Sequence, residues 1–278
     1  MSFKKIITSI KILRDIVVFC YRLKIVFNNI INNLYLSFKW LFISRETTNF
    51  TYDLTKLNKI YLAQTISHIV DKSFDEIYNY ILEVENDNSL KKHIITETKK
   101  SDQRFKSNKT VYFGRRIGWY AIVRAIKPKV IVETGVDKGL GACILTAALI
   151  KNNSEGYKGY YYGTDINPKA GFLLKNKYKN FGEILYGDSI KSLKHLSKKI
   201  DLFINDSNHS ADYEYNEYKV ILNKLSKNSI ILGDNAHYNS KLFSFSKKYN
   251  RSFLFFSEDP KNHFKNGAGI GFSYIINK

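Results

Sequence analysis

The stretch VIVETGVDKGLG, residues Val130–Gly141, decides the fold expected of this chain. A short run rich in β-branched residues ends in an acid, a turn with glycines follows, and residues 142–150 (ACILTAALI) are typical of a helix. Glycine in such a turn lets a ligand lie against bare backbone at the start of a helix. The stretch therefore predicts a strand–turn–helix unit with a binding site of the nucleotide type.

The C-terminal part of the chain alternates between strand and helix patterns. Strand patterns occur at 129–134, 159–165, 183–187, 200–206, 229–234, 252–257 and 269–276, and helical patterns lie between the first five of these and at 239–249. This alternation is typical of a doubly wound, mainly parallel sheet. We therefore predict an α/β, Rossmann-like domain that follows a helical N-terminal extension.

Acidic residues lie at the ends of the predicted strands. They are Glu133, Asp165, Asp188, Asp206 and Asp234. Ligands of open α/β sheets bind outside the carboxyl ends of the strands, so the acids together indicate a binding site. One such acid taken alone is more often a turn or N-cap residue.

The spacing of the glycines argues against two common nucleotide sites. An NAD fingerprint has G-x-G-x-x-G with an acid about 20 residues later. Here Gly135, Gly139 and Gly141 are spaced differently, and the next strand-end acid, Asp165, comes too late. No G-x-x-x-x-G-K-[ST] phosphate loop occurs in the sequence either.

Several motifs together resemble those of class I S-adenosylmethionine-dependent methyltransferases. Glu133-x-Gly135-x-x-x-Gly139 resembles motif I, Gly163-Thr164-Asp165 the second-strand motif, and Tyr186-Gly187-Asp188-Ser189 the third-strand motif. The blocks DLFINDSNHS (201–210) and IILGDN (230–235) are similar to the branch with macrocin O-methyltransferases and cephalosporin-hydroxylase-like proteins. They are also similar to the catechol and caffeoyl-CoA O-methyltransferases. The resemblance covers about residues 110–276.

The resemblance implies a seven-stranded sheet whose last strand is antiparallel. It implies an enzyme that moves a methyl group from S-adenosylmethionine to an oxygen of a small molecule or glycan, and a surface polysaccharide pathway is the predicted setting. In this family the second-strand acid binds the ribose hydroxyls, and the third-strand Asp and its neighbouring backbone hold the adenine. The implied cofactor-binding residues are Glu133, Gly135, Gly139, Asp165, Gly187, Asp188 and Asp206.

The resemblance also implies a metal site. In the catechol-type enzymes an Asp after strand four and an Asp-Asn pair after strand five bind a divalent metal, and these positions match Asp206, Asp234 and Asn235. Mg²⁺ takes oxygen ligands and could polarise substrate oxygens, which eases the loss of a hydroxyl proton. Two alternatives stay open: a transition metal on the Asp-x-x-His pairs that end in His209 and His237, and no metal at all.

Asp206 and His209 are the predicted catalytic residues. His209 stands where the catechol enzymes carry a lysine base, and an imidazole can accept a hydroxyl proton near neutral pH. The alternative is a histidine that only caps the following helix or hydrogen-bonds the site. We predict a solvated face for the residues of that helix that follow the histidine, namely Tyr213, Glu214, Tyr215 and Glu217.

Other residues near the motifs have open roles. Arg115, Arg116 and Trp119 precede the first strand and could cover the site or belong to a helix surface or core. Gly141 departs from the family pattern, because related enzymes often have serine there beside the cofactor. Asp137 stands in the loop where the more common motif has glycine.

The composition limits the partners and the compartment. The 278 residues include 44 Lys+Arg and 25 Asp+Glu, which gives a net charge of +19. This charge favours an anionic membrane surface or phosphorylated substrates, unless it reflects a general bias toward lysine. No nucleic-acid motif occurs, so we predict no specific nucleic-acid partner. Cys20 and Cys143 form neither a disulfide framework nor a metal spacing, which fits the reducing cytoplasm.

Residues 1–45 are predicted to form a basic amphipathic helical segment, with charged residues on one side of a helical wheel and apolar residues on the other. The longest run without charge, 25–38, contains several asparagines and is too short and too polar to span a membrane. Charges in the apolar run also argue against a signal peptide. The segment is expected either to lie on a membrane surface or to pack on protein, including a second subunit of a homo-oligomer.

Three regions are therefore predicted. Residues 1–45 form the amphipathic segment, 46–109 form a helical appendage that ends in a loop over 97–109, and 110–278 form the S-adenosylmethionine-binding domain. Two rival functions remain beside the methyltransferase. One is a metal-dependent, hydroxylase-like enzyme on the same fold, and the other is a non-catalytic membrane-surface or assembly protein.

Overall fold

The computed structural model describes residues 11–47, 50–234 and 236–276, and it divides into two units. One unit holds the N-terminal helix and Asn262–Lys265, and the other holds Glu46–Lys261 and the C-terminal strand. The predicted metal ligand Asn235 lies outside the described residues.

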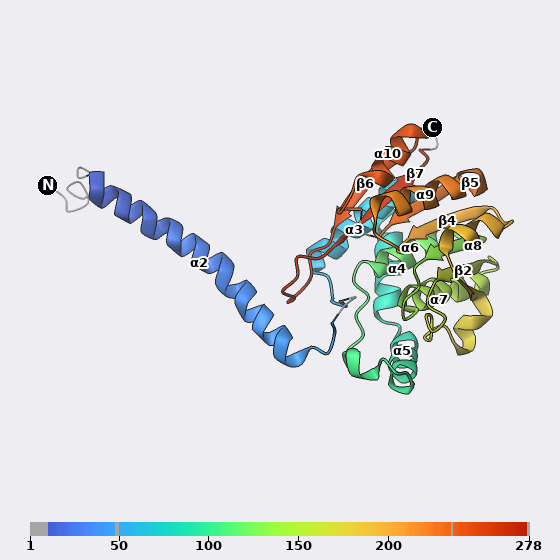
Figure 1. Ribbon diagram of the computed structural model, residues 1–278, viewed down its shortest axis with the longest axis horizontal. Helices are drawn as coiled ribbons and strands as arrows, with labels where there is room; N and C mark the ends of the chain where they lie inside the picture. Colours follow the sequence, from blue (N-terminus) through green and yellow to red (C-terminus); the bar gives the residue numbers. More distant parts are fainter. Residues whose placement is uncertain (1–10, 48–49, 235, 277–278) are drawn as a thin grey trace. The chain divides into compact units, whose positions relative to one another are not determined.

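The N-terminal unit is built on one long helix, α2, Lys11–Ile43 (Figure 1). An uninterrupted apolar stripe runs along it, from Leu13 and Ile16 through Phe27 to Leu34, because these side chains recur at helical spacing. The ring of Trp40 lies 4.7 Å from that of Phe264 within this unit. No helix in the described part of the chain is both long and apolar enough to cross a membrane.

The second unit contains a seven-stranded sheet with the order β3-β2-β1-β4-β5-β7-β6. Its strands are β1 Val130–Thr134, β2 Tyr160–Asp165, β3 Gly182–Tyr186, β4 Ile200–Asn205, β5 Leu225–Gly233, β6 Ser252–Ser257 and β7 Gly269–Tyr274. The first five strands are parallel, and β7 pairs antiparallel with both β5 and β6. The predicted Rossmann-like sheet with an antiparallel last strand is confirmed.

Helices cover both faces of this sheet (Figure 1). One face packs on α3 Lys56–Val70, α4 Phe74–Glu85, α5 Asn88–Lys100, α6 Arg116–Ile126 and α7 Leu140–Ser154. The other packs on α8 Ser189–His195, α9 Ala211–Ile221 and α10 Lys241–Lys248. Side chains alternate along each strand, so Ile131 and Leu202 join the first core, while Val132 and Phe203 join the second. Short 3₁₀ turns complete the list at Arg104–Lys106, Asn176–Phe181 and Leu222–Lys224.

The polar stretch over 55–100 forms three helices, α3, α4 and α5. Each begins at a side-chain cap, since Thr55, Ser73 and Asp87 accept hydrogen bonds from the backbone of the first turn. The predicted loop over 97–109 starts too early, because α5 continues to Lys100. These helices share the first core with the sheet, which ties the segment before β1 to the strands.

A buried acid lies within the first core beside the β1–α7 turn. The carboxyl of Glu133 accepts a hydrogen bond from the Tyr161 hydroxyl, and burial raises its pKa from 4.5 to about 8. A Cβ on Gly141 would collide with Glu133 Oε1 and lie 2.9 Å from the ring of Trp119. The serine that relatives often carry at this position therefore does not fit here.

We expect Gly141→Ala to destabilise the fold by about 1–3 kcal/mol through overpacking, even though alanine favours helices. Urea unfolding followed by circular dichroism measures this loss. The matched control is Asn153→Ala on the exposed side of α7, which should change stability by less than about 0.5 kcal/mol. Equal stability of the two variants would show that the core adapts to the added methyl group.

Candidate functional site

The carboxyl ends of β2, β1, β4 and β5 place four predicted site residues in one row. Backbone hydrogen bonds extend the strand pairing by one residue beyond the strand ends. Gly135 N donates to Thr164 O, Asp206 N to Thr134 O and Asp234 N to Asn205 O. At the β3 side of the row, Gly187 N donates to Asp165 O. The structure thus brings together Asp165, Gly135, Asp206 and Asp234 along one edge of the sheet.

The turn after β1 passes very close to β4. Gly135 has φ +82°, and a Cβ there would collide with the backbone of Asp206. The carboxylate of Asp165 holds the turn, because its Oδ2 accepts from the backbone N–H groups of Val136 and Asp137 at 3.0 and 2.9 Å. Asp165 therefore organises the glycine turn, and its Oδ1 accepts from Asn167 N at 2.8 Å.

The turn after β3 combines an open backbone with a helix cap. Gly187 has φ +130°, and a Cβ built there would meet nothing within 4 Å. Asp188 caps α8 by accepting from Lys191 N at 2.9 Å, and its second oxygen accepts from the Tyr213 hydroxyl at 3.0 Å. The capping role is the common role of a lone strand-end acid, and the adenine role of Asp188 stays a prediction.

Glu217 lies beneath the site, and its burial differs from the prediction. The prediction of a solvated face for this helix is wrong at two positions, because Glu217 is fully buried and Glu214 is nearly so. The Glu217 carboxyl accepts from Thr134 Oγ1 at 3.1 Å and from Ser207 Oγ at 2.8 and 2.9 Å. It also accepts from the side chains of Ser189 and Asn205.

Glu217 therefore ties together the ends of β1 and β4 and the start of α8, beneath the rim. Burial raises its pKa from 4.5 to about 7, although the hydroxyl donors oppose this shift. The signal in the sequence was a glutamate four residues before Ile221, which faces the second core.

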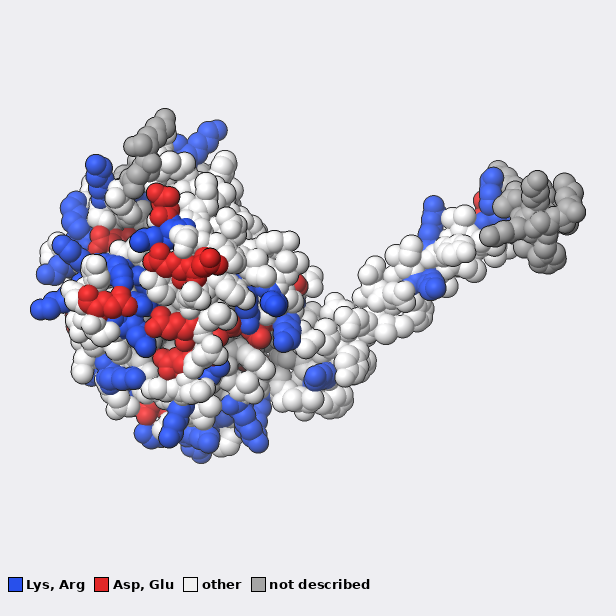
Figure 2. All heavy atoms as spheres, turned by 180° about the vertical axis from the view of Figure 1, so that it is seen from behind, with Lys and Arg blue, Asp and Glu red and all other residues white. Residues whose placement is uncertain are grey.

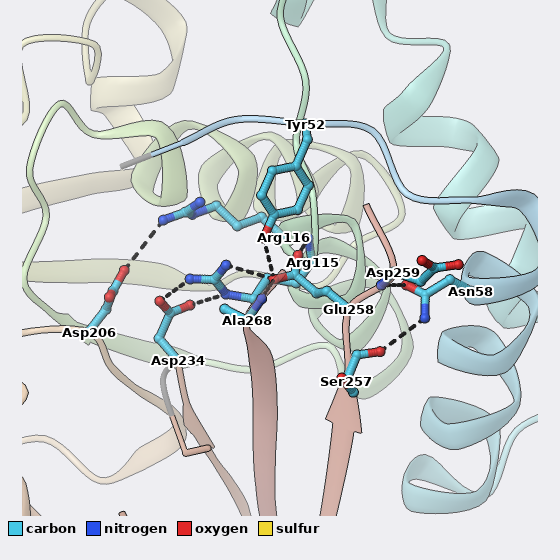
Figure 3. A network of polar contacts seen from close by, with 10 residues as sticks. All are labelled: Tyr52, Asn58, Arg115, Arg116, Asp206, Asp234, Ser257, Glu258, Asp259 and Ala268. Carbon is cyan, nitrogen blue, oxygen red and sulfur yellow. Dashed lines mark hydrogen bonds and ion pairs between the residues drawn. The ribbon is translucent and has the colours of Figure 1, made fainter. Parts of the chain in front are cut away.

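Arg115 occupies the acidic end of the row (Figure 3). Its Nε donates to Asp234 Oδ1 at 2.6 Å and its Nη2 to Asp234 Oδ2, while Nη1 donates to Glu258 Oε2 at 3.0 Å. Glu258 also accepts from the Tyr52 hydroxyl at 2.7 Å and from Ala268 N at 3.0 Å. Burial alone would lower the pKa of Arg115, but the two carboxylates raise it well above its usual value.

Asp206 is partly buried and Asp234 is buried, and the pKa values of these two neighbouring carboxyl groups shift in opposite directions. Burial and the neighbouring charge of Asp234 raise the pKa of Asp206 well above its usual value. For Asp234, burial is outweighed by the charge and hydrogen bonds of Arg115, which hold its pKa at about 2. Arg116 lies on the other side of Asp206, with its Nη2 3.4 Å from Asp206 Oδ2.

The metal prediction does not fit this arrangement. Both oxygens of Asp234 receive hydrogen bonds from Arg115, and a second guanidinium, that of Arg116, stands beside Asp206. A divalent ion would have to displace one cation and approach another. Over residues 11–47, 50–234 and 236–276, no group of three His, Cys, Asp or Glu side chains could hold a metal ion.

His209 is half-exposed on the turn before α9. Its Nδ1 lies 3.7 Å from Oε1 of Glu214, which is buried and whose other oxygen accepts from Asn239 Nδ2 at 2.9 Å. A carboxylate behind an imidazole can orient the ring. The structure thus places an acid behind the predicted base.

The residues of the row fit a nucleoside cofactor better than a metal. Open space surrounds the backbone of Gly187, whereas Gly135 and Gly139 lie against the backbones of Asp206 and Gly171. Thr164 Oγ1 is buried at the end of β2 and has no hydrogen-bond partner among the described residues. Glu133, in contrast, is buried on the Tyr161 side, so its predicted contact with a cofactor stays a prediction.

Comparisons with known proteins find similarity to methyltransferases. Residues 132–236 match a family described as a methyltransferase domain, and no curated protein matches the chain. The O-methyltransferase TomG from Streptomyces achromogenes, solved with S-adenosylmethionine, is 13% identical with a TM-score of 0.51, over 69% of this chain and 91% of that one. A methyltransferase from Geobacter sulfurreducens is 16% identical with a TM-score of 0.50, over 66% and 90%. The chain therefore has a Rossmann-like methyltransferase fold, with a methyltransferase domain match over β1 to β5.

We expect Glu217 to make stability depend on pH. Its pKa rises from 4.5 to about 7 on folding, so the folded state keeps a proton that the unfolded state releases in this window. The associated stability is complete below pH 4.5 and is lost as pH rises through 7, by about 3 kcal/mol. Glu217→Gln cannot titrate, so the difference in unfolding free energy between wild type and variant should change by about this amount.

Urea unfolding of both proteins between pH 4.5 and 8 measures this change. Glu183→Gln, at an exposed position on β3, is the matched control and should run parallel to wild type. A Glu217→Gln curve that also runs parallel would contradict a carboxyl that is protonated on folding.

Proposed function

We propose that this chain is an S-adenosylmethionine-dependent O-methyltransferase that acts on a small molecule or a glycan. The methyltransferase domain match and the fold support the enzyme class. The observation that carries the proposal is the single row of Asp165, Gly135 and Asp206 at neighbouring strand ends, with open backbone at Gly187. An acceptor from a surface polysaccharide pathway remains the proposed substrate class.

The two halves of the row would have different tasks. The β1, β2 and β3 ends, with Gly135, Asp165, Gly187 and Asp188, would hold the nucleoside. Bound S-adenosylmethionine supplies the activated methyl group. The β4 and β5 ends, with Asp206, would face the acceptor, and positioning of the two partners accounts for much of the rate.

His209 is the proposed general base for the acceptor hydroxyl. Glu214 stands behind its Nδ1, so Nε2 is the ring atom that could accept the proton. No step is assigned to magnesium, because Arg115 already holds both oxygens of Asp234. The hydroxylase-like alternative needs a metal and meets the same obstacle.

Binding of S-adenosylhomocysteine, measured by calorimetry, tests the proposed function. We expect Asp165→Asn to weaken binding about tenfold, since a charged hydrogen-bond acceptor is lost. Asp201→Asn is the matched control, because Asp201 also accepts from two backbone N–H groups, those of Lys129 and Val130, but at the opposite end of the sheet. No binding by wild type would leave the non-catalytic alternative.

The same series separates the base from the binding residues. We expect His209→Ala to bind S-adenosylhomocysteine like wild type and to transfer labelled methyl to acceptor extracts about a hundredfold more slowly. His68→Ala, at an exposed position on α3, should leave both properties unchanged. Full transfer by His209→Ala would remove the base role.

We also propose that the protein is cytoplasmic and that α2 places it on an anionic membrane surface. The described helix carries Arg14, Arg22, Lys24 and Lys39 against the single acid Asp15, opposite a stripe of apolar side chains. Figure 2 shows basic side chains in separate groups along a helix whose surface is mostly uncharged. A helix with such a basic face and an apolar face binds at the interface of anionic lipids.

Flotation of the full chain with phosphatidylserine vesicles tests the membrane proposal. Phe27→Gln with Leu34→Gln removes two residues of the apolar stripe and should reduce binding at least tenfold. Ile25→Gln with Leu36→Gln, on the polar side of the same helix, is the matched control and should bind nearly as wild type. If the wild-type chain forms a stable dimer that does not bind vesicles, and the Phe27→Gln/Leu34→Gln variant is monomeric, packing on a second subunit is supported instead.

A further inference from the structure

The adjacent residues Arg115 and Arg116 differ sharply in how far their hydrogen-bond donors are used. Arg115 makes a two-point contact with Asp234 and a further contact with Glu258, and its side chain is 11% exposed. These two carboxylates use three of the five N–H donors of the guanidinium and engage all three of its nitrogens. Arg115 is therefore a fixed part of the site and has little capacity to bind a ligand.

The guanidinium of Arg116 has unused hydrogen-bond donors. Its only ion pair with a described residue is the long contact from Nη2 to Asp206 at 3.4 Å. Its Nε is buried and has no hydrogen-bond partner in the described part of the chain. Burying such a donor without a partner is unfavourable, and a planar guanidinium is suited to donate two parallel hydrogen bonds to one carboxylate or phosphate.

The Arg116 guanidinium is positioned by its contact with the Trp119 ring. Its Cζ lies 5.1 Å from the centre of the Trp119 ring, and Trp119 is itself fully buried on α6. Its side chain is 18% exposed, so it can be reached from solvent. Figure 3 shows Arg116 directed at Asp206, apart from the pair formed by Arg115 and Asp234.

Arg116 lies on the half of the row that the cofactor does not need. Its contact is at the end of β4, next to the backbone that Gly135 approaches, whereas the proposed nucleoside residues lie on β1, β2 and β3. An anion held by Arg116 would thus stand beside the methyl donor, on the acceptor side.

We propose that Arg116 binds an anionic group, carboxylate or phosphate, of the methyl acceptor and so selects acidic acceptors. That the anion belongs to a methyl acceptor rests on the proposed function, whereas the anion site itself does not. It also assigns to a guanidinium the gripping role that a metal ion has in the catechol-type resemblance. The carboxylate of the cofactor is a second anion that could reach Arg116, and the experiment separates the two.

The chain offers a direct readout of anion binding. Its two tryptophans are Trp40 and Trp119, so Trp40→Phe leaves Trp119, beneath Arg116, as the single fluorophore. Inorganic phosphate and, separately, acetate are titrated into this full-length protein with and without saturating S-adenosylhomocysteine, with the ionic strength held constant by chloride. The variants are Arg116→Gln and Arg116→Lys, and the matched control is Arg104→Gln, whose guanidinium also lies over an aromatic ring, that of Phe105.

We expect phosphate or acetate to change the Trp119 emission also when S-adenosylhomocysteine is bound. Arg116→Gln should raise the dissociation constant at least tenfold, Arg116→Lys should give an intermediate value, and Arg104→Gln should match the parent. Equal anion affinity in Arg116→Gln and the parent would overturn the proposal. Loss of the anion response on adding S-adenosylhomocysteine, together with tenfold weaker S-adenosylhomocysteine binding by Arg116→Gln, would assign Arg116 to the cofactor and also overturn it.

A metal arm uses the same protein. Mn²⁺ quenching of Trp119 that saturates at one ion per chain and disappears in Asp234→Asn would place a metal at the acceptor side and overturn the proposal. Failure of S-adenosylhomocysteine to bind at all would instead count against the proposed function, while the phosphate titration without cofactor would still test Arg116.

Discussion

Carboxyl groups that lose contact with water at the ends of strands need a cation, hydrogen-bond donors or a raised pKa to offset the lost hydration. This requirement shapes the whole site. Asp234 is compensated by the two-point ion pair with Arg115, and Glu258 by the same guanidinium, a tyrosine hydroxyl and backbone donors. Asp206 is compensated in a different way, by a raised pKa that favours its neutral form. Without Arg115 a charged Asp234 would stay buried with its main partner removed, which is strongly destabilising.

This compensation links distant segments of the second unit. Tyr52 comes from the segment before α3, Arg115 from the start of α6, and Glu258 from the end of β6, yet all three meet beside the end of β5. Glu217 does the same on the other face, where it joins β1, β4 and α8. Helix α6 before β1 thus belongs to the architecture of the site, because its start supplies the cations Arg115 and Arg116.

The same chemistry separates this chain from the metal-dependent pattern that its motifs resemble. The acids that match metal ligands are present, but a guanidinium takes the place where an ion would neutralise them. A protein can satisfy buried carboxylates with either kind of cation, and the two choices leave different groups for the acceptor. A metal offers open coordination positions, whereas Arg116 offers a flat pair of donors.

The sequence by itself determined the order of strands and helices, the glycine turn and the positions of Asp165, Asp188, Asp206 and Asp234, because periodicity and turn chemistry are local properties. Only the tertiary structure decided that Glu217 is buried, that Gly141 has no room for a side chain, and that Arg115 reaches Asp234 and Glu258. These partners are separated by up to 143 positions in the chain. No local pattern encodes such pairings, since a charged residue on a helix looks the same in sequence whether it faces water or a buried partner of opposite charge.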